Sequence, residues 1–415
     1  MPSRAPLSRP PAWRILVAGG GPPGLILALA LTRSLGPAVE VQVLDPAFQL
    51  KRSDPRAYSL TPGIVTLLDV LGIWSELAGA AQPVRAMTIT DSRLGDAVRP
   101  AYLRFENDDR PLAHLIEADR LDGALRAACE AGAIGLLPRR VTGFTAGSGR
   151  TEVTTDDGAV LSAALLVACD GFRSRLRELA GIGWVGRRYP QAGIVAVVRH
   201  ERPHDGVAIQ HFLPSGPFAI LPLTASADAP HRSSIVWTEV ERNVAALLRV
   251  GSAELNREVA ARFGAELGEV ELLSDPVPFP LAVGLARSYV APRLALVGDA
   301  AHQVHPLAGQ GLNLGLADAA ALAERIADAV RLGLDPGGDP VLQAYGRDRR
   351  LDAVVLAGAT DTLNRLFSND RLPERVLRDI GLGLVDRAPA LKRFFAGQAA
   401  GTSPRAPRLM RGEPL

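Results

Sequence analysis

Three glycines near the N-terminus have the spacing of loops that bind the phosphates of a dinucleotide. They form the motif Gly19-x-Gly21-x-x-Gly24. In such a loop the first glycine permits a tight turn, the second lets the backbone approach a pyrophosphate, and the third lets a helix pack on a strand. Asp45 stands 21 residues after Gly24, where a carboxylate can accept hydrogen bonds from ribose hydroxyls. A glycine turn with a purely structural role is the alternative for such a motif taken alone.

The elements around these glycines favour nucleotide binding. Residues 14–18 predict a short buried strand, residues 25–35 are apolar over a helical length, and residues 39–44 predict a second strand. Strand, glycine turn, helix and strand within about 30 residues form a dinucleotide-binding unit. The start of the helix would offer free N–H groups and its positive dipole end to phosphates. Pro22 and Pro23 suit a first helical turn.

Two further motifs follow predicted strands later in the chain. Asp170-Gly171 comes directly after the apolar run 164–169, and Gly298-Asp299 comes directly after the run 295–297. The second motif is soon followed by a glycine-rich stretch, HPLAGQGLNLGLAD, over residues 305–318.

With these three motifs in this order, the sequence resembles the class A flavoprotein aromatic hydroxylases, whose familiar member is para-hydroxybenzoate hydroxylase. Within that class it is most similar to the ubiquinone-biosynthesis hydroxylase family. The similarity extends from Ile15 to about Gly401 and is weakest in the middle of the chain. The resemblance implies FAD as the cofactor, which the first glycine motif alone does not distinguish from NAD. The stretches that carry the resemblance most specifically are 56–60, 71–74, 305–318, 360–368 and 391–395.

The resemblance also implies roles for residues around the flavin. Asp299 would accept hydrogen bonds from the ribityl chain, and a helix-capping aspartate is the alternative. Gly309, Gly311 and Asn313 would line the pyrimidine edge of the isoalloxazine, with a plain glycine loop as the alternative. There the positive end of a helix would meet the negative charge of the reduced flavin. The predicted cofactor-binding residues are Gly19, Gly21, Gly24, Asp45, Arg56, Arg120, Asp170, Asp299, Pro306, Gly309, Gly311, Leu312 and Asn313.

Several charged residues have alternatives that the sequence leaves open. Asp170 and Arg177 would lie between FAD and the path of the nicotinamide donor, or would form a structural ion pair or turn. Arg56 and Arg120 match flavin-side arginines of the family, and a surface position is the alternative for Arg120. His302 has a second histidine three residues later, but no third ligand has suitable spacing, so we expect no metal site.

The reaction is implied by the same resemblance. NAD(P)H or another electron donor would reduce FAD, and molecular oxygen would then give a flavin C4a-hydroperoxide that hydroxylates an electron-rich ring. The cofactor supplies this chemistry while the protein positions the ring and excludes water. The predicted substrate is a prenylated phenolic intermediate of ubiquinone biosynthesis, and the sequence does not identify a catalytic base. The alternatives are a hydroxylase of another aromatic compound, a flavin reductase acting on an isoprenoid, and a non-catalytic FAD-bound scaffold.

The middle of the chain is predicted to hold the substrate. Strand-like runs over 193–199, 207–213, 218–223 and 234–240 are separated by turn residues and predict a mostly antiparallel sheet. Its apolar residues suit a greasy ring, although alternate strand positions point to opposite faces and ordinary core packing is an equal alternative. The residues considered for this pocket are His211, Phe212, Leu213, Pro214, Phe218, Ile220 and Pro222.

The fold class that follows is α/β, a Rossmann-like FAD-binding domain with an inserted, mostly antiparallel β-sheet substrate domain and C-terminal helices. Helices are expected over 61–71, 119–131, 311–332 and 341–367, the last with a helical continuation to residue 395. The predicted division is 1–100 for the first part of the FAD-binding domain, 101–115 for a substrate-domain strand, 116–184 for the second part of the FAD-binding domain, 185–285 for the substrate domain, 286–335 for the GD motif and its helix, and 336–415 for a C-terminal helical region.

Composition limits the partners and the location. The formal net charge is +2, so no global basic field favours a nucleic acid as partner. The two cysteines, Cys129 and Cys169, support neither a disulfide scaffold nor a zinc site. Because no apolar run is long and uninterrupted enough to cross a bilayer, we expect a cytoplasmic protein.

The C-terminal end mixes basic and apolar residues. The basic residues Lys392, Arg393, Arg405, Arg408 and Arg411 predict a solvated tail, with membrane contact as the alternative. The helical stretch before them suits peripheral binding at the inner membrane, docking in a quinone-biosynthesis complex, or packing on the protein's own core. The residues on which this depends are Leu366, Phe367, Leu391, Phe394 and Phe395 beside Arg365, Lys392 and Arg393.

Overall fold

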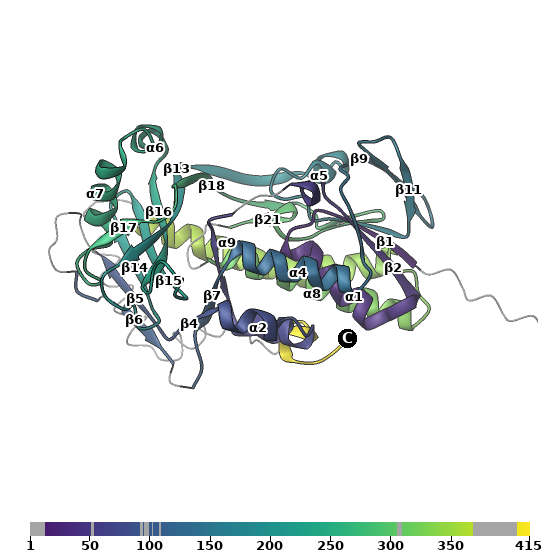
Figure 1. Cartoon of the computed structure of the whole chain (residues 1–415). Helices are drawn as coiled ribbons and strands as arrows, with labels where there is room; N and C mark the ends of the chain where they lie inside the picture. Colours follow the sequence, from purple (N-terminus) through teal and green to yellow (C-terminus); the bar gives the residue numbers. More distant parts are fainter. Residues whose placement is uncertain are drawn as a thin grey trace, which may run out of the picture.

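Two large sheets lie at opposite ends of an elongated molecule, with long helices running along its middle (Figure 1). One sheet has six strands and the other has nine. The computed structural model describes residues 13–50, 54–91, 94, 99–101, 103–107, 109–304, 309–367 and 405–415.

The six-stranded sheet is the nucleotide-binding unit that the sequence predicts. Its strand order is β19-β20-β12-β1-β2-β8, and every pair is parallel except β19 with β20. The central strands are short apolar runs whose side chains are buried, as in parallel sheets covered on both faces. The bounds are β1 (Trp13–Ala18), β2 (Val39–Leu44), β8 (Gly135–Leu137), β12 (Leu165–Ala168), β19 (Val290–Ala291) and β20 (Leu294–Leu296).

Long helices pack beside this sheet and confirm the helices predicted from the sequence. Helix α1 is buried at every position from Gly24 to Leu31, because it is apolar all round and contacts β2, α4 and α8. The bounds are α1 (Pro22–Leu35), α2 (Pro62–Val70), α3 (Trp74–Leu77), α4 (Ala118–Ala131), α5 (Arg175–Leu179), α8 (Gln310–Arg331) and α9 (Asp339–Phe367).

The nine-stranded sheet has the order β21-β18-β13-β16-β15-β14-β5-β6, and β17 pairs with β13. It is antiparallel except where β14 pairs with β5. Helices α6 (Glu241–Leu247) and α7 (Ser252–Phe263) contribute to the apolar core on one of its faces. The strand bounds are β5 (Ala86–Asp91), β6 (Leu103–Glu106), β13 (Trp184–His200), β14 (Val207–Leu213), β15 (Gly216–Leu223), β16 (Arg232–Val240), β17 (Val270–Leu272), β18 (Val277–Ala286) and β21 (His302–Gln303).

The second sheet is inserted into the first in sequence. Most of its strands lie between β12 and β20, and the long paired strands β13 and β18 run along the molecule from one end toward the other (Figure 1). The predicted fold class is therefore confirmed. Strand β5 was not expected, since it lies within the range predicted for the FAD-binding part yet pairs with β14, a strand about 120 residues later. The domain boundaries themselves stay a prediction.

Two small sheets complete the core of the fold. Strands β3 (Ala57–Leu60), β7 (Ala113–Glu117) and β4 (Gln82–Val84) form one of them. Strands β9 (Val141–Ala146), β10 (Thr151–Thr155) and β11 (Val160–Ala163) form the other, and β10 with β11 is the hairpin predicted from its Asp-Asp-Gly turn.

The last eleven residues pack against the helices of the first part. Leu409 and Met410 are buried, and this segment contacts α2 and α8 (Figure 1). Arg408 pairs with Glu324 and Asp328. The expected solvated tail is therefore wrong for this segment, because burial of two apolar side chains and ion pairs to α8 hold it in place. The predicted interfacial residues between 362 and 404 lie outside the side chains that the structure describes.

No helix among the described residues is both long and apolar enough to cross a membrane.

Candidate functional site

The sequence motifs meet at one edge of the six-stranded sheet. The neighbouring parallel strands β2, β1, β12 and β20 end at this edge, and they are followed by Asp45, Gly19, Asp170 and Asp299 respectively. In open parallel sheets ligands bind outside the carboxyl ends of the strands. Four motifs that are far apart in the chain therefore surround one space.

The three glycines of the first motif have different surroundings. A Cβ atom at Gly19, whose φ is +118°, would lie 2.1 Å from the carbonyl oxygen of Cys169. A Cβ atom at Gly24 would lie 2.1 Å from the carbonyl oxygen of Gly19. Packing of the protein on itself therefore requires these two glycines. A Cβ atom at Gly21 would meet no atom within 4 Å, so Gly21 borders open space that a pyrophosphate fits.

The start of α1 offers fewer N–H groups than the sequence suggested. Pro22 and Pro23 have none, and the Gly24 amide donates to the Gly21 carbonyl oxygen at 3.0 Å. The positive dipole end of the helix and the Gly21 amide are what this turn presents to an anion.

Asp45 ties the glycine loop to the end of β2. One carboxylate oxygen accepts a hydrogen bond from the Gly20 amide and the other accepts one from the Ala47 amide, each at 2.7 Å. Each oxygen keeps a further lone pair. Contact with a ribose is thus compatible with its position, and this role stays a prediction.

Asp299 follows β20 at this edge of the sheet and is open to solvent. Its side chain is exposed, whereas the density of protein around it raises the pKa of the carboxyl. Electrostatic interactions with His302 and Arg56 oppose this rise, and Asp318 adds to it. An exposed carboxylate at this edge of the sheet is a suitable acceptor for hydroxyl groups of a ligand.

Arg56 directly precedes β3 and lies near Asp299. Its guanidinium pairs with Asp54 at 2.5 Å and lies over the Tyr58 ring at 5.7 Å. The Asp54 hydrogen bond raises the pKa of Arg56, so the group stays cationic. Asp122 of α4 is near this pair, and burial raises its pKa to about 6. The sequence did not single out Asp122 or assign a role to Tyr58, since their position depends on β3 meeting α4.

Asn313 clamps the start of α8 to β3. Its amide nitrogen donates to the Ser59 carbonyl oxygen at 2.7 Å and to the Gly309 carbonyl oxygen at 3.0 Å, while its amide oxygen accepts from the Thr61 amide at 3.0 Å. The side chain is therefore used by the protein, and any flavin contact here belongs to backbone groups. Gly309 has φ +62°, and its Cβ would lie 3.0 Å from Ser59, so glycine is required.

Arg177 and Asp170 of the DG motif differ in how they are bonded. Arg177 has a structural role, whereas Asp170 has an acceptor left for a ligand. Arg177 donates to the Ala300 and Phe172 carbonyl oxygens and lies 4.3 Å from the Trp184 ring, so it joins the DG loop to the GD loop. Asp170 accepts from the Leu176 amide through one oxygen, and its other oxygen is buried with no partner among the described residues. An unpaired buried acceptor at this edge fits a donor from a bound ligand.

The other predicted residues are placed as follows. Arg120 is exposed in the first turn of α4, and Gly311 and Leu312 are half-buried in the first turn of α8. Pro306 lies outside the described residues.

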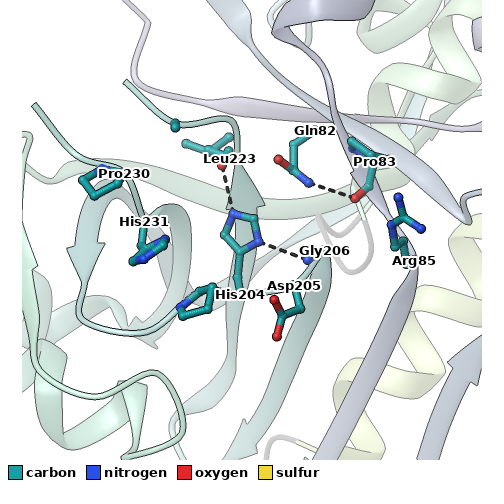
Figure 2. Close-up of a pocket in the computed structure, with 11 residues that line it drawn as sticks. Gln82, Pro83, Arg85, His204, Asp205, Gly206, Leu223, Pro230 and His231 are labelled. Atoms are coloured by element: carbon teal, nitrogen blue, oxygen red, sulfur yellow. Dashed lines mark hydrogen bonds between the residues drawn. The ribbon is translucent and has the colours of Figure 1, made fainter. Parts of the chain in front are cut away.

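A hollow of about 450 Å³ opens elsewhere, beside β4 and the nine-stranded sheet. Figure 2 shows His204 held inside it, with one ring nitrogen bonded to the Leu223 carbonyl and the other to the Gly206 amide. Because both nitrogens are used, this histidine is not available to a ligand. None of the predicted cofactor residues lines this hollow.

Of the two alternatives that the sequence left open for the apolar residues of the middle sheet, ordinary core packing holds for four. Leu213, Phe218 and Ile220 belong to the core under α6 and α7. His211 is bonded to Thr90 and to the Phe263 carbonyl oxygen, and burial lowers its pKa to about 4. These side chains point to the helix-covered face because strand residues two apart share a face.

A Rossmann-like sheet with motif loops at one edge and a second sheet inserted into it defines a flavoprotein of the two-part, FAD-binding class. A family model described as an FAD binding domain matches residues 12–357, and the chain belongs to that family.

The relatives agree with this assignment. Ubiquinone hydroxylase UbiL of Rhodospirillum rubrum is 41% identical, with 97% of this chain and 93% of the relative covered. The 3-demethoxyubiquinol 3-hydroxylase of Escherichia coli is 33% identical over 93% of this chain and 98% of the relative. Among solved structures, p-nitrophenol 4-monooxygenase PnpA of Pseudomonas putida has a TM-score of 0.74 at 20% identity, covering 94% and 99% of the chains, and shows the same fold.

FAD is the cofactor, and the chain is an FAD-dependent monooxygenase of aromatic compounds, as predicted. Such an enzyme uses an electron donor, molecular oxygen and an aromatic substrate. The open space at Gly21 and the unpaired Asp170 oxygen fit this cofactor.

Proposed function

We propose that this enzyme hydroxylates the aromatic ring of a prenylated phenolic intermediate in ubiquinone biosynthesis. The observation that carries the proposal is similarity over nearly the whole chain to proteins named as ubiquinone hydroxylases. Full-length similarity includes the inserted sheet, where specificity for the ring would be decided.

In this proposal the residues of the sheet edge hold FAD. The Gly21 turn and Asp45 would bind the adenosine diphosphate half, and Asp299 would accept hydrogen bonds from the ribityl hydroxyls. The positive end of α8, beginning after Gly309, would stabilise negative charge on the flavin ring. When bound, FAD supplies the activated oxygen that the protein cannot supply.

The substrate ring would lie on the face of the nine-stranded sheet opposite α6 and α7. Gln210 and Ser234 occupy that face, because their strand neighbours Ile209 and Ile235 belong to the helix-covered core. Each has a buried polar atom with no partner among the described residues, the Gln210 amide nitrogen and the Ser234 hydroxyl. Such groups fit the hydroxyl or carbonyl oxygens of a phenolic ring.

We propose NAD(P)H as the electron donor.

We also propose that the enzyme collects its prenylated substrate by peripheral contact with a membrane surface or by docking in a quinone-biosynthesis complex. A prenyl chain is strongly apolar and resides in the bilayer, so an enzyme that collects it must meet that surface.

Deletion of the gene tests the proposal. The deletion strain should accumulate a prenylated precursor lacking one ring oxygen, and wild-type protein should restore quinone where Asp299→Ala does not. Normal quinone levels in a strain without a redundant hydroxylase would refute the biosynthetic role and leave another aromatic compound as substrate.

A further inference from the structure

A buried carboxylate on α8 gathers three hydrogen bonds beneath the GD loop. One oxygen of Asp318 accepts from the Gly298 amide at 3.1 Å and bonds the His302 ring nitrogen Nε2 at 2.5 Å. Its other oxygen accepts from Arg349 Nε at 2.8 Å. Arg349 comes from α9 and also pairs with Asp352. All three central side chains are buried, with exposures of 1% for His302, 0% for Asp318 and 5% for Arg349.

These bonds fix both ends of the short loop that carries Asp299. Gly298 precedes Asp299 and has φ +64°, and His302 follows it by three residues. Asp318 therefore holds the loop both before and after Asp299. The packing beneath leaves little freedom, since a Cβ at Gly315 would lie 3.1 Å from the Gly298 Cα.

Asp318 is buried as a charged group, and its partners offset the cost of that burial. Burial alone would raise the pKa of Asp318, but the charges and hydrogen bonds of His302 and Arg349 lower it, so the carboxyl is ionised. The Tyr289 ring lies 6.0 Å from the His302 ring, and neither the Tyr289 hydroxyl nor His302 Nδ1 has a partner among the described residues. Among the described residues, Asp318 is therefore the hydrogen-bond partner of the His302 ring.

We propose that His302 is a positioning residue which, through Asp318 and Arg349, holds the Gly298–Asp299 turn in the conformation that binds FAD. The proposal assigns it no contact with the cofactor. It predicts that FAD affinity depends on a hydrogen-bond donor at the position of Nε2, and not on an imidazole as such.

FAD titration of the cofactor-stripped full chain tests this. His302→Leu removes the donor and should weaken the Kd for FAD roughly tenfold to a hundredfold. His302→Gln places an amide nitrogen near the position of Nε2 and should stay within about threefold of wild type. Asp318→Asn should weaken binding as His302→Leu does. The visible absorption spectrum of bound FAD should change in the two weak variants and be normal in His302→Gln.

His211→Leu is the matched control, because His211 is equally buried, at 1% exposure, and lies in the core of the other sheet. It should lower the melting temperature without changing the Kd for FAD. If His302→Leu does not fold, His302→Asn, whose amide nitrogen falls short of Asp318, takes its place. Wild-type affinity in the variants lacking the donor, failure of His302→Gln to rescue, or an equal loss in His211→Leu would overturn the proposal.

Discussion

Asp299 is the side chain at which the site can be tested most simply. It is exposed near Arg56, and Asp318 bonds the residues on either side of it, Gly298 and His302. Asp299→Ala deletes an acceptor for ribityl hydroxyls, so FAD binding should weaken roughly tenfold to a hundredfold while the fold is kept. Absorbance of bound flavin per protein gives the result, and full occupancy at low FAD concentration would contradict the role.

Asp122 gives a prediction for pH dependence. Folding raises its pKa from 3.8 to about 6, chiefly by burial. An acid with a raised folded-state pKa destabilises the fold above its unfolded pKa, so this cost disappears as the pH falls through 6 and toward 4. Asp122→Asn should therefore increase the free energy of unfolding at pH 8 by up to about 2 kcal/mol, after allowance for solvent screening, and change it little at pH 4.

Urea unfolding of the cofactor-free protein at the two pH values measures this difference. Asp69→Asn is the control, because Asp69 is an exposed carboxylate at the end of α2. A stabilisation by Asp122→Asn that is equal at pH 8 and pH 4 would show that the charge of Asp122 is not its cause.

In the turn between β1 and α1, glycine serves two purposes. Gly19 permits close packing within the protein, and Gly21 leaves space for a ligand. Gly21→Ala should fold normally, since its Cβ meets nothing within 4 Å and its φ of −76° suits any residue. The added methyl group enters the proposed pyrophosphate space, so the Kd for FAD should rise at least about tenfold. Gly19→Ala should fail to fold, because its Cβ would overlap the Cys169 carbonyl.

Gly79→Ala is the matched control for this turn, since it too adds a Cβ to open space but far from the motif in the sequence. Fluorescence quenching of FAD gives the affinities, and thermal melts give the stabilities. Unchanged FAD affinity in Gly21→Ala would place the pyrophosphate elsewhere.

A helix or strand could be predicted from the sequence where the residues that determine it lie close together in the chain. The unit β1–α1–β2 follows from two apolar runs and a glycine turn within one stretch of chain. Strand β5 could not be predicted, because its partner β14 is about 120 residues away. The first residues of β13 are partly charged and exposed, and only their pairing with β18 makes them part of a strand.

Side-chain roles were harder to predict than strands. Alternation along β14 and β15 shows that two faces exist but not which face the helices α6 and α7 cover, so the sequence could not decide whether Phe218 and Ile220 belong to a pocket or to the core. The role of Asp318 was equally hidden, because its partners Gly298, His302 and Arg349 lie 16 to 31 residues away in the sequence.

At the scale of the whole molecule, the proposed membrane contact needs a test that keeps the C-terminus. Truncation after residue 386 would also remove Leu409 and Met410, which pack on the core. Replacing Phe394 and Phe395 with serine in the full chain is the cleaner change. If these residues bind a bilayer surface, flotation with anionic liposomes should fall severalfold at unchanged FAD content.

The control for flotation is Phe172→Ser, since Phe172 is an exposed aromatic on the DG loop. Equal flotation of wild type and the double variant would mean that these two phenylalanines do not carry the contact.

Labelled oxygen shows most directly whether this monooxygenase hydroxylates a prenylated phenol. FAD-loaded enzyme would be incubated with NAD(P)H, a prenylated phenol precursor and ¹⁸O₂, and the product analysed by mass spectrometry. We expect a product with one new ring hydroxyl that carries one ¹⁸O atom, formed only when donor and oxygen are both present. A product without ¹⁸O, or one formed by donor-dependent reduction in the absence of oxygen, would contradict it.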